Sequence, residues 1–291
     1  MVEFSSVSDV GERLAATGYL ADEAIATTVF LADRLGKPLL VEGPAGVGKT
    51  ELAKAVARAT GAGLVRLQCY EGLDEARALY EWNYKKQLLR IQASADDAAW
   101  DEVHDDVFSA EFLLDRPLLT AIRRDEATVL LIDETDKADV EVEGLLLEVL
   151  SDFQVTIPEL GTITARRRPF VVLTSNATRE LSEALKRRCL YLHLGYPTRQ
   201  REKEIVLAQA PEAAERLVEQ VVRAVAAMRG LELRKPPSIA ETIDWARTLI
   251  ALGKDELDAA TARGTLGAVL KHVADQERVV RELALADGPP G

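Results

Sequence analysis

The sequence predicts an α/β protein, a three-layer sandwich around a parallel five-stranded sheet, followed by a small all-helical C-terminal domain. Up to about Tyr196, short apolar runs alternate with helical stretches, which is typical of parallel strands joined by crossover helices. Beyond Pro197, apolar residues such as Leu217, Val218 and Val221 recur at helical spacing. We therefore expect an α/β domain over 1–196 and a helical domain over 197–291.

Five apolar runs are the candidate strands of the sheet. Their apolar residues do not alternate with polar ones, as expected for strands that helices cover on both faces. The runs are Pro38–Val41, Leu64–Cys69, Thr128–Ile132, Phe170–Thr174 and Cys189–His193.

Two segments interrupt this alternation. The segment at about 71–114 is longer than one crossover needs and predicts an insertion after the second strand. At about 153–164, two β-prone runs flank a Pro/Gly turn and predict a β-hairpin. In the helical domain, breaks at Gly230, the Lys235-Pro236-Pro237 stretch and Gly253 predict three or four helices, and the last four residues predict a frayed tail.

Composition and charge narrow the classes of function. Of the 291 residues, 47% are hydrophobic and 29% charged, as in ordinary globular proteins. The formal net charge of -12 disfavours nucleic acid as a partner because it repels phosphate backbones. The opening residues do not form a signal peptide and no apolar run is long enough to span a membrane, so we expect a cytoplasmic protein. Two cysteines and three scattered histidines indicate neither a disulfide framework nor a zinc site.

The strongest motif for chemistry is a phosphate-binding loop. Gly43–Thr50 reads G-x-x-x-x-G-K-T between a strand and a helix. Its glycines let backbone N–H groups face a phosphate, Lys49 neutralises the β and γ oxygens, and Thr50 supplies a hydroxyl to Mg²⁺. A dinucleotide fold would instead show G-x-G-x-x-G. The expected nucleotide-binding residues are Gly43, Pro44, Ala45, Gly46, Val47, Gly48, Lys49, Thr50 and Glu51.

Polar residues at three later strand or helix ends complete the candidate site. Asp133 and Glu134 end and follow an apolar run, where Asp133 would hold Mg²⁺ through water and Glu134 would orient and polarise the attacking water. Asn176 follows the next strand and could contact the γ-phosphate, although asparagine there is also a common turn former. Arg187 and Arg188 end a helical stretch, either as cations paired with a helix C-terminus or as an arginine finger.

The order of these features resembles that of the AAA+ superfamily of P-loop ATPases. The features are the phosphate-binding loop, the Asp-Glu strand, the hairpin, the strand-end asparagine, the arginine helix and the helical lid. The hairpin, the insertion and the string Asp133-Glu134-Thr135-Asp136-Lys137-Ala138 resemble its MoxR group. The strings L-T-S-N, L-S-E-A-L-K-R-R-C-L-Y-L and K-P-P-S-I-A-E-T-I-D-W-A resemble the CoxD-type members associated with carbon monoxide dehydrogenase maturation. The resemblance implies a Mg²⁺-dependent ATPase in a hexameric ring. It also implies a metalloenzyme client and a partner with a von Willebrand A domain.

The resemblance further implies individual roles. The Asn176 strand would lie between the P-loop strand and the Asp133 strand, and Asn176 would be the sensor 1 residue. Arg188 would be the arginine finger, with Arg187 as the near alternative. Gly18, Tyr19 and Leu20 fall where the family contacts adenine.

One position departs from the family pattern. Ile239 stands where many members have the sensor 2 arginine. Either Arg234 or Lys235 substitutes for that arginine, or the contact is absent, so we assign no sensor 2 residue.

Two other classes of function remain open from the residues alone. A nucleic-acid-dependent motor or clamp loader would use Arg166, Arg167 and Arg168, which we expect on the hairpin, as phosphate contacts. The acidic balance favours a motor that acts on proteins. A small-molecule kinase or GTPase would also have a P-loop, but the sequence has no N-K-x-D element for guanine, and the Asp-Glu pair favours water activation.

Overall fold

The computed structural model describes residues 3–93 and 107–283. These residues form two compact units. The sheet unit holds the described residues of 1–17, 21–42 and 50–193. The helical unit holds 18–20, 43–49 and the described residues from 194 onward. The P-loop peptide before Thr50 thus packs within the helical unit, although β1 and α3 flank it in the chain.

The sheet unit is built on a five-stranded parallel sheet with the order β2-β5-β8-β1-β9. β8 lies between β1, which leads into the P-loop, and β5, which ends in Asp133, so the strand order that the resemblance implies is confirmed. Each predicted strand is present with its ends within one residue of the expected ones. The strands are β1 (Leu39–Glu42), β2 (Gly63–Gln68), β5 (Thr128–Asp133), β8 (Phe170–Ser175) and β9 (Leu190–His193).

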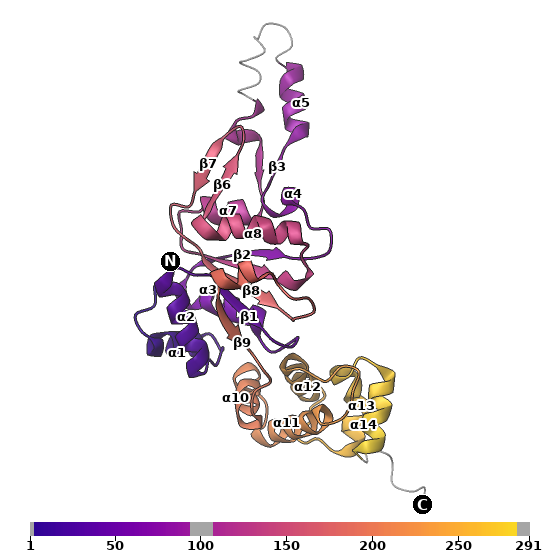
Figure 1. The fold of residues 1–291 in the computed structure, drawn as a ribbon. Helices are drawn as coiled ribbons and strands as arrows, with labels where there is room; N and C mark the ends of the chain where they lie inside the picture. Colours follow the sequence, from indigo (N-terminus) through magenta and orange to yellow (C-terminus); the bar gives the residue numbers. More distant parts are fainter. Residues whose placement is uncertain (1–2, 94–106, 284–291) are drawn as a thin grey trace, which may run out of the picture. The chain divides into compact units, whose positions relative to one another are not determined.

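Helices cover both faces of this sheet (Figure 1). All residues of the two central strands β5 and β8 are buried, as their unbroken apolar runs predict. One face packs its β2, β5 and β8 side chains against α7, α8 and α9, and α2 packs against β1 and β9. The result is the predicted three-layer α/β sandwich. Outside the insertion after β2, the described helices of the sheet unit are α1 (Val7–Ala16), α2 (Glu23–Leu35), α3 (Lys49–Thr60), α7 (Pro117–Arg123), α8 (Val140–Asp152) and α9 (Glu183–Arg188).

The register of the sheet brings the carboxyl ends of its strands together. Gln68 at the end of β2 is paired with Asp133 at the end of β5. Val41 in β1 is paired with Thr174 in β8. Because parallel strands end at the same edge, polar residues from successive strands converge there, which is where ligands bind in open α/β sheets.

The expected insertion after β2 contains several short elements within the described residues. Its two strands pair antiparallel, and the ring of Trp82 meets that of Phe108 edge to face at 5.3 Å between centroids. Residues 94–106 of the predicted insertion, with Trp100, lie outside the described residues. The elements are α4 (Glu75–Ala78), β3 (Tyr80–Trp82), α5 (Tyr84–Ala93), η1 (Ala110–Phe112) and β4 (Leu113–Asp115).

The predicted hairpin is formed by β6 (Gln154–Ile157) and β7 (Gly161–Thr164), which pair antiparallel around an exposed turn. The placement of Arg166, Arg167 and Arg168 on this hairpin was wrong. β7 ends at Thr164, so the three arginines lie in the connection to β8.

The helical unit has five helices within its described residues, whereas the sequence predicts three or four. The break between α13 and α14 contains neither glycine nor proline, so no composition signal marks it. The core centres on Trp245, which is fully buried and donates its indole N–H to Thr265 at 2.8 Å. The predicted frayed tail lies outside the described residues. The helices are α10 (Arg199–Gln209), α11 (Glu215–Arg229), α12 (Ile239–Ala251), α13 (Ala259–Val269) and α14 (Val273–Glu282).

Within 3–93 and 107–283, no helix combines the length and the apolar character that a membrane-spanning helix needs.

Candidate active site

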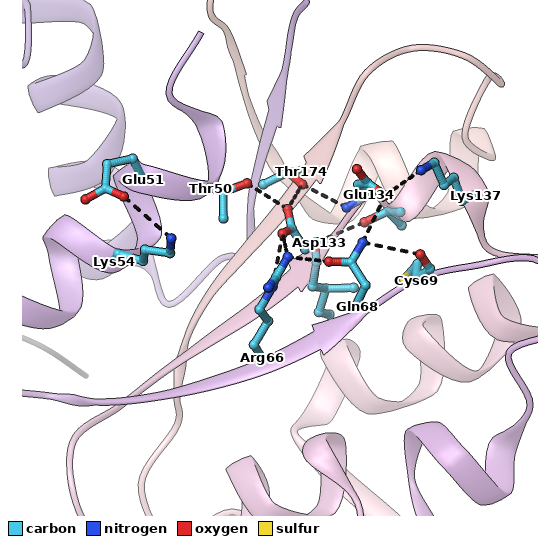
Figure 2. A network of polar contacts seen from close by, with 12 residues as sticks. Thr50, Glu51, Lys54, Arg66, Gln68, Cys69, Asp133, Glu134, Lys137 and Thr174 are labelled. Carbon is cyan, nitrogen blue, oxygen red and sulfur yellow. Dashed lines mark hydrogen bonds and ion pairs between the residues drawn. The ribbon is translucent and has the colours of Figure 1, made fainter. Parts of the chain in front are cut away.

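The centre of the site is the carboxylate of Asp133, which is only 3% exposed at the end of β5. Its Oδ1 accepts hydrogen bonds from the hydroxyls of Thr50, at 2.9 Å, and Thr174, at 2.6 Å (Figure 2). Thr50 comes from the start of α3 and Thr174 from β8, so three elements fix one buried acid. The sequence predicts Thr50 and Asp133 as a pair, and the structure brings them together.

The second oxygen of Asp133 is held by an arginine. Arg66 Nε and Nη2 both donate to Oδ2, at 3.1 and 2.5 Å. Arg66 lies on β2, directly beside β5 in the sheet. Sequence reasoning did not single out Arg66. The available signal was a charged residue in an otherwise apolar strand, two residues before the strand end.

Glu134 has an uncommon backbone conformation, with φ at +57° and ψ at 48°. A non-glycine residue in this left-handed region is frequently associated with a functional site. Its N–H donates to the Thr174 hydroxyl at 2.9 Å. Its Oε2 accepts from Gln68 Nε2 at 2.9 Å and from Lys137 Nζ at 2.6 Å, and this hydrogen bond raises the pKa of Lys137. Glu134 is thus held one residue beyond Asp133, at the same strand end.

Asn176 directly follows β8, on a loop that Asp136 holds in place. Asp136 is 3% exposed, and its Oδ2 accepts from the N–H and the hydroxyl of Thr178, at 3.0 and 2.5 Å. Burial raises the pKa of Asp136, but the hydrogen bonds from Thr178 and from the Asn176 backbone outweigh it and hold that pKa below its usual value. Asp136 therefore connects η2 (Thr135–Lys137) to the loop that contains Asn176.

The P-loop packs within the helical unit. Lys49 is 6% exposed, and its Nζ donates to the carbonyls of Gly43 and Pro44, at 2.7 Å each. Gly46 has a φ of +74°, and a Cβ there would overlap Ser238 at the start of α12. Both constraints require glycine at this position of the motif.

The region expected to contact adenine also lies beside this loop. The ring of Tyr19 approaches Gly48 so closely that a Cβ at Gly48 would stand 3.7 Å from Tyr19 Cε2. Gly18 accepts a hydrogen bond from Gln209 Nε2 at 2.9 Å, and Leu20 is half-buried. Tyr19 is therefore next to the P-loop, as the prediction requires.

The donor set at Thr50 and Asp133 fits magnesium. A hydroxyl and a carboxylate oxygen are hard ligands, and Mg²⁺ in nucleotide sites takes one or two protein ligands besides phosphates and waters. The described residues contain no group of three or more His, Cys, Asp or Glu side chains suited to a metal ion. The site therefore has side chains that fit a nucleotide-bound magnesium.

Residues 38–189, from β1 to the end of α9, match the family model described as the AAA domain of the dynein-related subfamily. The chain belongs to this family. It is an AAA+ ATPase of the dynein-related type, and the family implies ATP as its ligand.

Relatives of this AAA+ chain extend over most of its length. An uncharacterized protein of Staphylococcus haemolyticus is 26% identical over 270 residues, covering 90% of this chain and 92% of that protein. The denitrification regulatory protein NirQ of Pseudomonas aeruginosa is 26% identical over 235 residues, covering 78% and 81%. The chaperone protein ClpB 2 of Parasynechococcus marenigrum is 36% identical over 140 residues, but these are only 46% of this chain and 13% of ClpB 2.

Among solved structures, a mutant of Thermotoga maritima RuvB superposes with a TM-score of 0.50. The match covers 99% of this chain and 81% of that chain, at 19% sequence identity. It supports the fold of the AAA+ chain, a five-stranded parallel sheet followed by helices.

The two candidate arginine fingers of the AAA+ domain differ in their surroundings. Arg188 donates to Ser151 Oγ at 2.7 Å and to the carbonyl of Ala184 at 3.2 Å, so it contacts α8 and its own helix. Arg187 is exposed, and within the described part of the chain its side chain takes part in no hydrogen bond or ion pair. The carbonyl contact fits a helix-end cation, and both residues remain candidates for a role at a neighbouring site.

Three further predicted or reactive side chains, those of Glu51, Cys69 and Cys189, have other surroundings, although Cys69 lies close enough to Asp133, Glu134 and Asp136 for their charges to act on its thiol. Glu51 points toward cations of its own helix, at 2.6 Å from Arg58 and 3.7 Å from Lys54. Burial raises the pKa of the Cys69 and Cys189 thiols to about 12, so neither is a nucleophile at neutral pH. The AAA+ site thus depends on oxygen and nitrogen side chains.

Proposed function

We propose that this chain hydrolyses ATP with bound Mg²⁺ and uses the cycle to remodel a client protein. The observation that carries the hydrolytic part is the Thr50 hydroxyl 2.9 Å from the buried carboxylate of Asp133, with Glu134 as the next residue. Thr50 and Asp133 hold the magnesium, which neutralises charge on the phosphates. Glu134 accepts a proton from the attacking water and orients it.

The other predicted residues take supporting roles in this proposal. The N–H groups of Gly43–Thr50 and the ammonium of Lys49 bind the phosphates, with Glu51 beside them. Lys49 already lies at the loop, where its Nζ now donates to two carbonyls of the same peptide. Asn176 contacts the γ-phosphate or the water, and Tyr19 and Leu20 contact the adenine. We take 1–196 as the nucleotide-binding domain and 197–291 as its lid.

We propose that the chain is a CoxD-like member of the MoxR group. Its client would then be a metalloenzyme, and the process would be the maturation of that enzyme. The strings around Asn176, Arg188 and Ile239 that resemble that type support this. A relative named as a chaperone, matched over 46% of this chain, also supports a protein that acts on other proteins. A hexameric ring and a partner with a von Willebrand A domain complete the proposal.

The alternative, a nucleic-acid-dependent motor, has less support. Each of the three arginines expected to bind phosphates has a partner in its own chain. Arg166 lies 3.4 Å from Asp125, Arg167 lies 4.0 Å from Glu3, and Arg168 lies over the ring of Phe153 at 5.3 Å. Stimulation of the ATPase by DNA or RNA would favour this alternative over a protein client.

The proposal predicts that Lys49→Ala weakens nucleotide binding by roughly tenfold or more, because it removes the cation of the phosphate cradle and leaves its backbone in place. Titration with a fluorescent ATP analogue measures this, and a circular dichroism melt checks the fold. Lys254→Ala, at an exposed position in the helical unit, is the control and should bind as the wild type does. Equal affinities of Lys49→Ala and the wild type would contradict the P-loop assignment.

A further inference from the structure

The guanidinium of Arg66 covers the oxygen of Asp133 that the two threonines leave free. Arg66 Nε and Nη2 lie 3.1 and 2.5 Å from Oδ2, while both hydroxyls bind Oδ1. The side chain of Arg66 is 50% exposed and that of Asp133 is 4% exposed. The arginine is therefore open to solvent at the side of a buried carboxylate; Figure 2 shows its two contacts with Asp133.

The hydrogen-bond geometry shows that this pair is specific. Two donors of one guanidinium converge on one oxygen, and the same Nη2 also donates to Gln68 Oε1. An arginine on an edge strand could extend into solvent without loss of packing. Here it turns along the sheet edge to the neighbouring strand, toward the acid that the proposed function assigns to magnesium.

A guanidinium and a magnesium ion cannot both interact with this carboxylate as strongly as each would alone. The carboxylate carries one negative charge, and two cations on it repel each other, the more so where water is partly excluded. Because Arg66 is half exposed, its guanidinium can be rehydrated on leaving Asp133, whereas the buried carboxylate cannot. The arginine is thus the partner that gives way.

We propose that Arg66 is a reversible competitor of the nucleotide's magnesium for Asp133, and so sets the magnesium concentration at which nucleotide binds tightly. This inference rests on the proposed function, because it takes Thr50 and Asp133 as the magnesium ligands. It assigns to β2 a residue that tunes the metal site and belongs neither to the P-loop nor to the acidic pair.

If Arg66 only anchored Asp133, its removal would change the magnesium requirement in the opposite direction. If the guanidinium only oriented Asp133 for the metal, its loss would disorder the carboxylate, and more magnesium would be needed. If Arg66 competes, Thr50 and Thr174 still hold Oδ1 after its loss, and less magnesium suffices.

The test is the magnesium dependence of nucleotide binding without turnover. The affinity of a non-hydrolysable fluorescent ATP analogue is titrated against free Mg²⁺ for the wild type and Arg66→Gln. We expect the half-saturating Mg²⁺ concentration to fall about tenfold, the factor that matches the loss of one charge-assisted hydrogen bond. Direct Mn²⁺ binding, followed by electron paramagnetic resonance, should strengthen in parallel. An unchanged or higher half-saturating concentration would overturn the proposal.

Two variants separate direct competition from a general effect of charge. Arg66→Lys keeps the charge but loses the two-donor geometry, so it should shift in the same direction as Arg66→Gln. If Arg66→Lys had the magnesium requirement of the wild type, direct competition would be overturned. If Arg66→Gln does not fold, Arg66→Lys is the variant that tests the proposal. Arg116→Gln removes another half-exposed arginine ion pair, at 2.6 Å from Glu81, and should leave the magnesium response unchanged. A shift of equal size in Arg116→Gln would also overturn the inference.

The same titration separates this inference from the proposed function. If nucleotide binding by the wild type does not depend on Mg²⁺ at all, the assignment of Thr50 and Asp133 is wrong, and the inference falls with it. If the wild type depends on Mg²⁺ but Arg66→Gln does not lower the requirement, only the inference is wrong. Asp133→Asn weakens the competition, so adding Arg66→Gln to it should change the magnesium requirement much less than Arg66→Gln changes that of the wild type. A change of undiminished size would overturn the inference.

Discussion

At the scale of single residues, the hydroxyl of Thr174 connects the two acids of the site. It donates to Asp133 Oδ1 at 2.6 Å and accepts the N–H of Glu134 at 2.9 Å, and the residue is 1% exposed. The hydroxyl thus fixes the buried carboxylate and the left-handed backbone of Glu134 at once. Both contacts lie at the strand edge where the chemistry is proposed.

We predict that Thr174→Val destabilises the protein by about 1–3 kcal/mol, because it keeps the shape and leaves a buried carboxylate oxygen and an N–H each short of a partner. Urea denaturation measures this free energy of unfolding. Thr156→Val, at an exposed position of β6 with its hydroxyl 3.1 Å from that of Thr162, should change it by less than roughly 0.5 kcal/mol. Equal effects of the two variants would show that the Thr174 hydroxyl has no special role.

The sequence predicts those site residues that follow from motif and position. Thr50, Asp133, Glu134 and Asn176 each stand at the start of a helix or the end of a strand, where the P-loop makes their roles specific. Arg66 and Thr174 were missed, because inside an apolar run each reads as an ordinary strand residue. Their roles depend on the register of neighbouring strands: Ile132 pairs with Leu173, directly before Asp133 and Thr174, and Leu131 pairs with Arg66.

At the scale of elements, the strands of the sheet were predictable and the helices of the helical unit were less so. Unbroken apolar runs of strand length mark strands that are buried on both faces. The number of helices in the helical unit is predicted from helix-breaking residues, and the connection from Leu270 to His272 carries no residue that terminates a helix by its own backbone preference. Leu270, the residue at which α13 ends, is buried in the core of the helical unit.

Within the helical unit, a buried ion pair joins three helices. Arg229 of α11 is 14% exposed and Glu202 of α10 is 1% exposed, with two nitrogen–oxygen contacts of 2.6 and 2.8 Å. Thr242 of α12 donates to the same carboxylate at 2.7 Å. Arg229 also lies over the ring of Tyr196, at 4.6 Å from its centroid.

We predict that Arg229→Ala destabilises the helical unit by about 3–5 kcal/mol, because it leaves the Glu202 carboxylate buried without its cation. The matched control is Arg216→Ala, which breaks an ion pair of 2.8 Å whose partners are 69% and 54% exposed. That control should cost less than about 1 kcal/mol. Urea or thermal unfolding of both variants measures the difference, and similar losses would refute the claim that burial makes the Arg229 pair important.

At the scale of the whole molecule, we propose that hydrolysis depends on assembly. Arg188 and Arg187 end α9 just before the edge strand β9. A cation supplied to a transferring phosphoryl group from a neighbouring subunit accelerates reaction by about 10³–10⁵ in well-studied cases. Head-to-tail contacts that place such a cation in a neighbour's site either close into a ring or continue as a helix, and the resemblance to the MoxR group favours a ring in our proposal. ATPase activity per chain should then rise with protein concentration.

We predict that an Arg188→Ala chain and a Lys49→Ala chain, each nearly inactive alone, recover activity when mixed. At mixed interfaces an intact P-loop can meet an intact arginine. The measurement is steady-state ATPase activity after subunit exchange, with Arg187→Ala in place of Arg188→Ala as the comparison that decides between the two arginines. If neither arginine variant recovers activity in well-exchanged mixtures, neither acts in trans, and the contact of Arg188 with Ala184 describes its role as a helix-end cation.

The central claim is that Glu134 activates the water at a magnesium–ATP site built on Asp133. The most direct measurement compares ATP affinity and ATP turnover for Glu134→Gln and the wild type. The amide keeps the shape of the side chain but cannot accept the proton, so we expect ATP affinity within about threefold of the wild type and turnover reduced by roughly 10²–10⁴-fold. Turnover of Glu134→Gln at the wild-type rate would contradict the account, because the water would then be activated by another group.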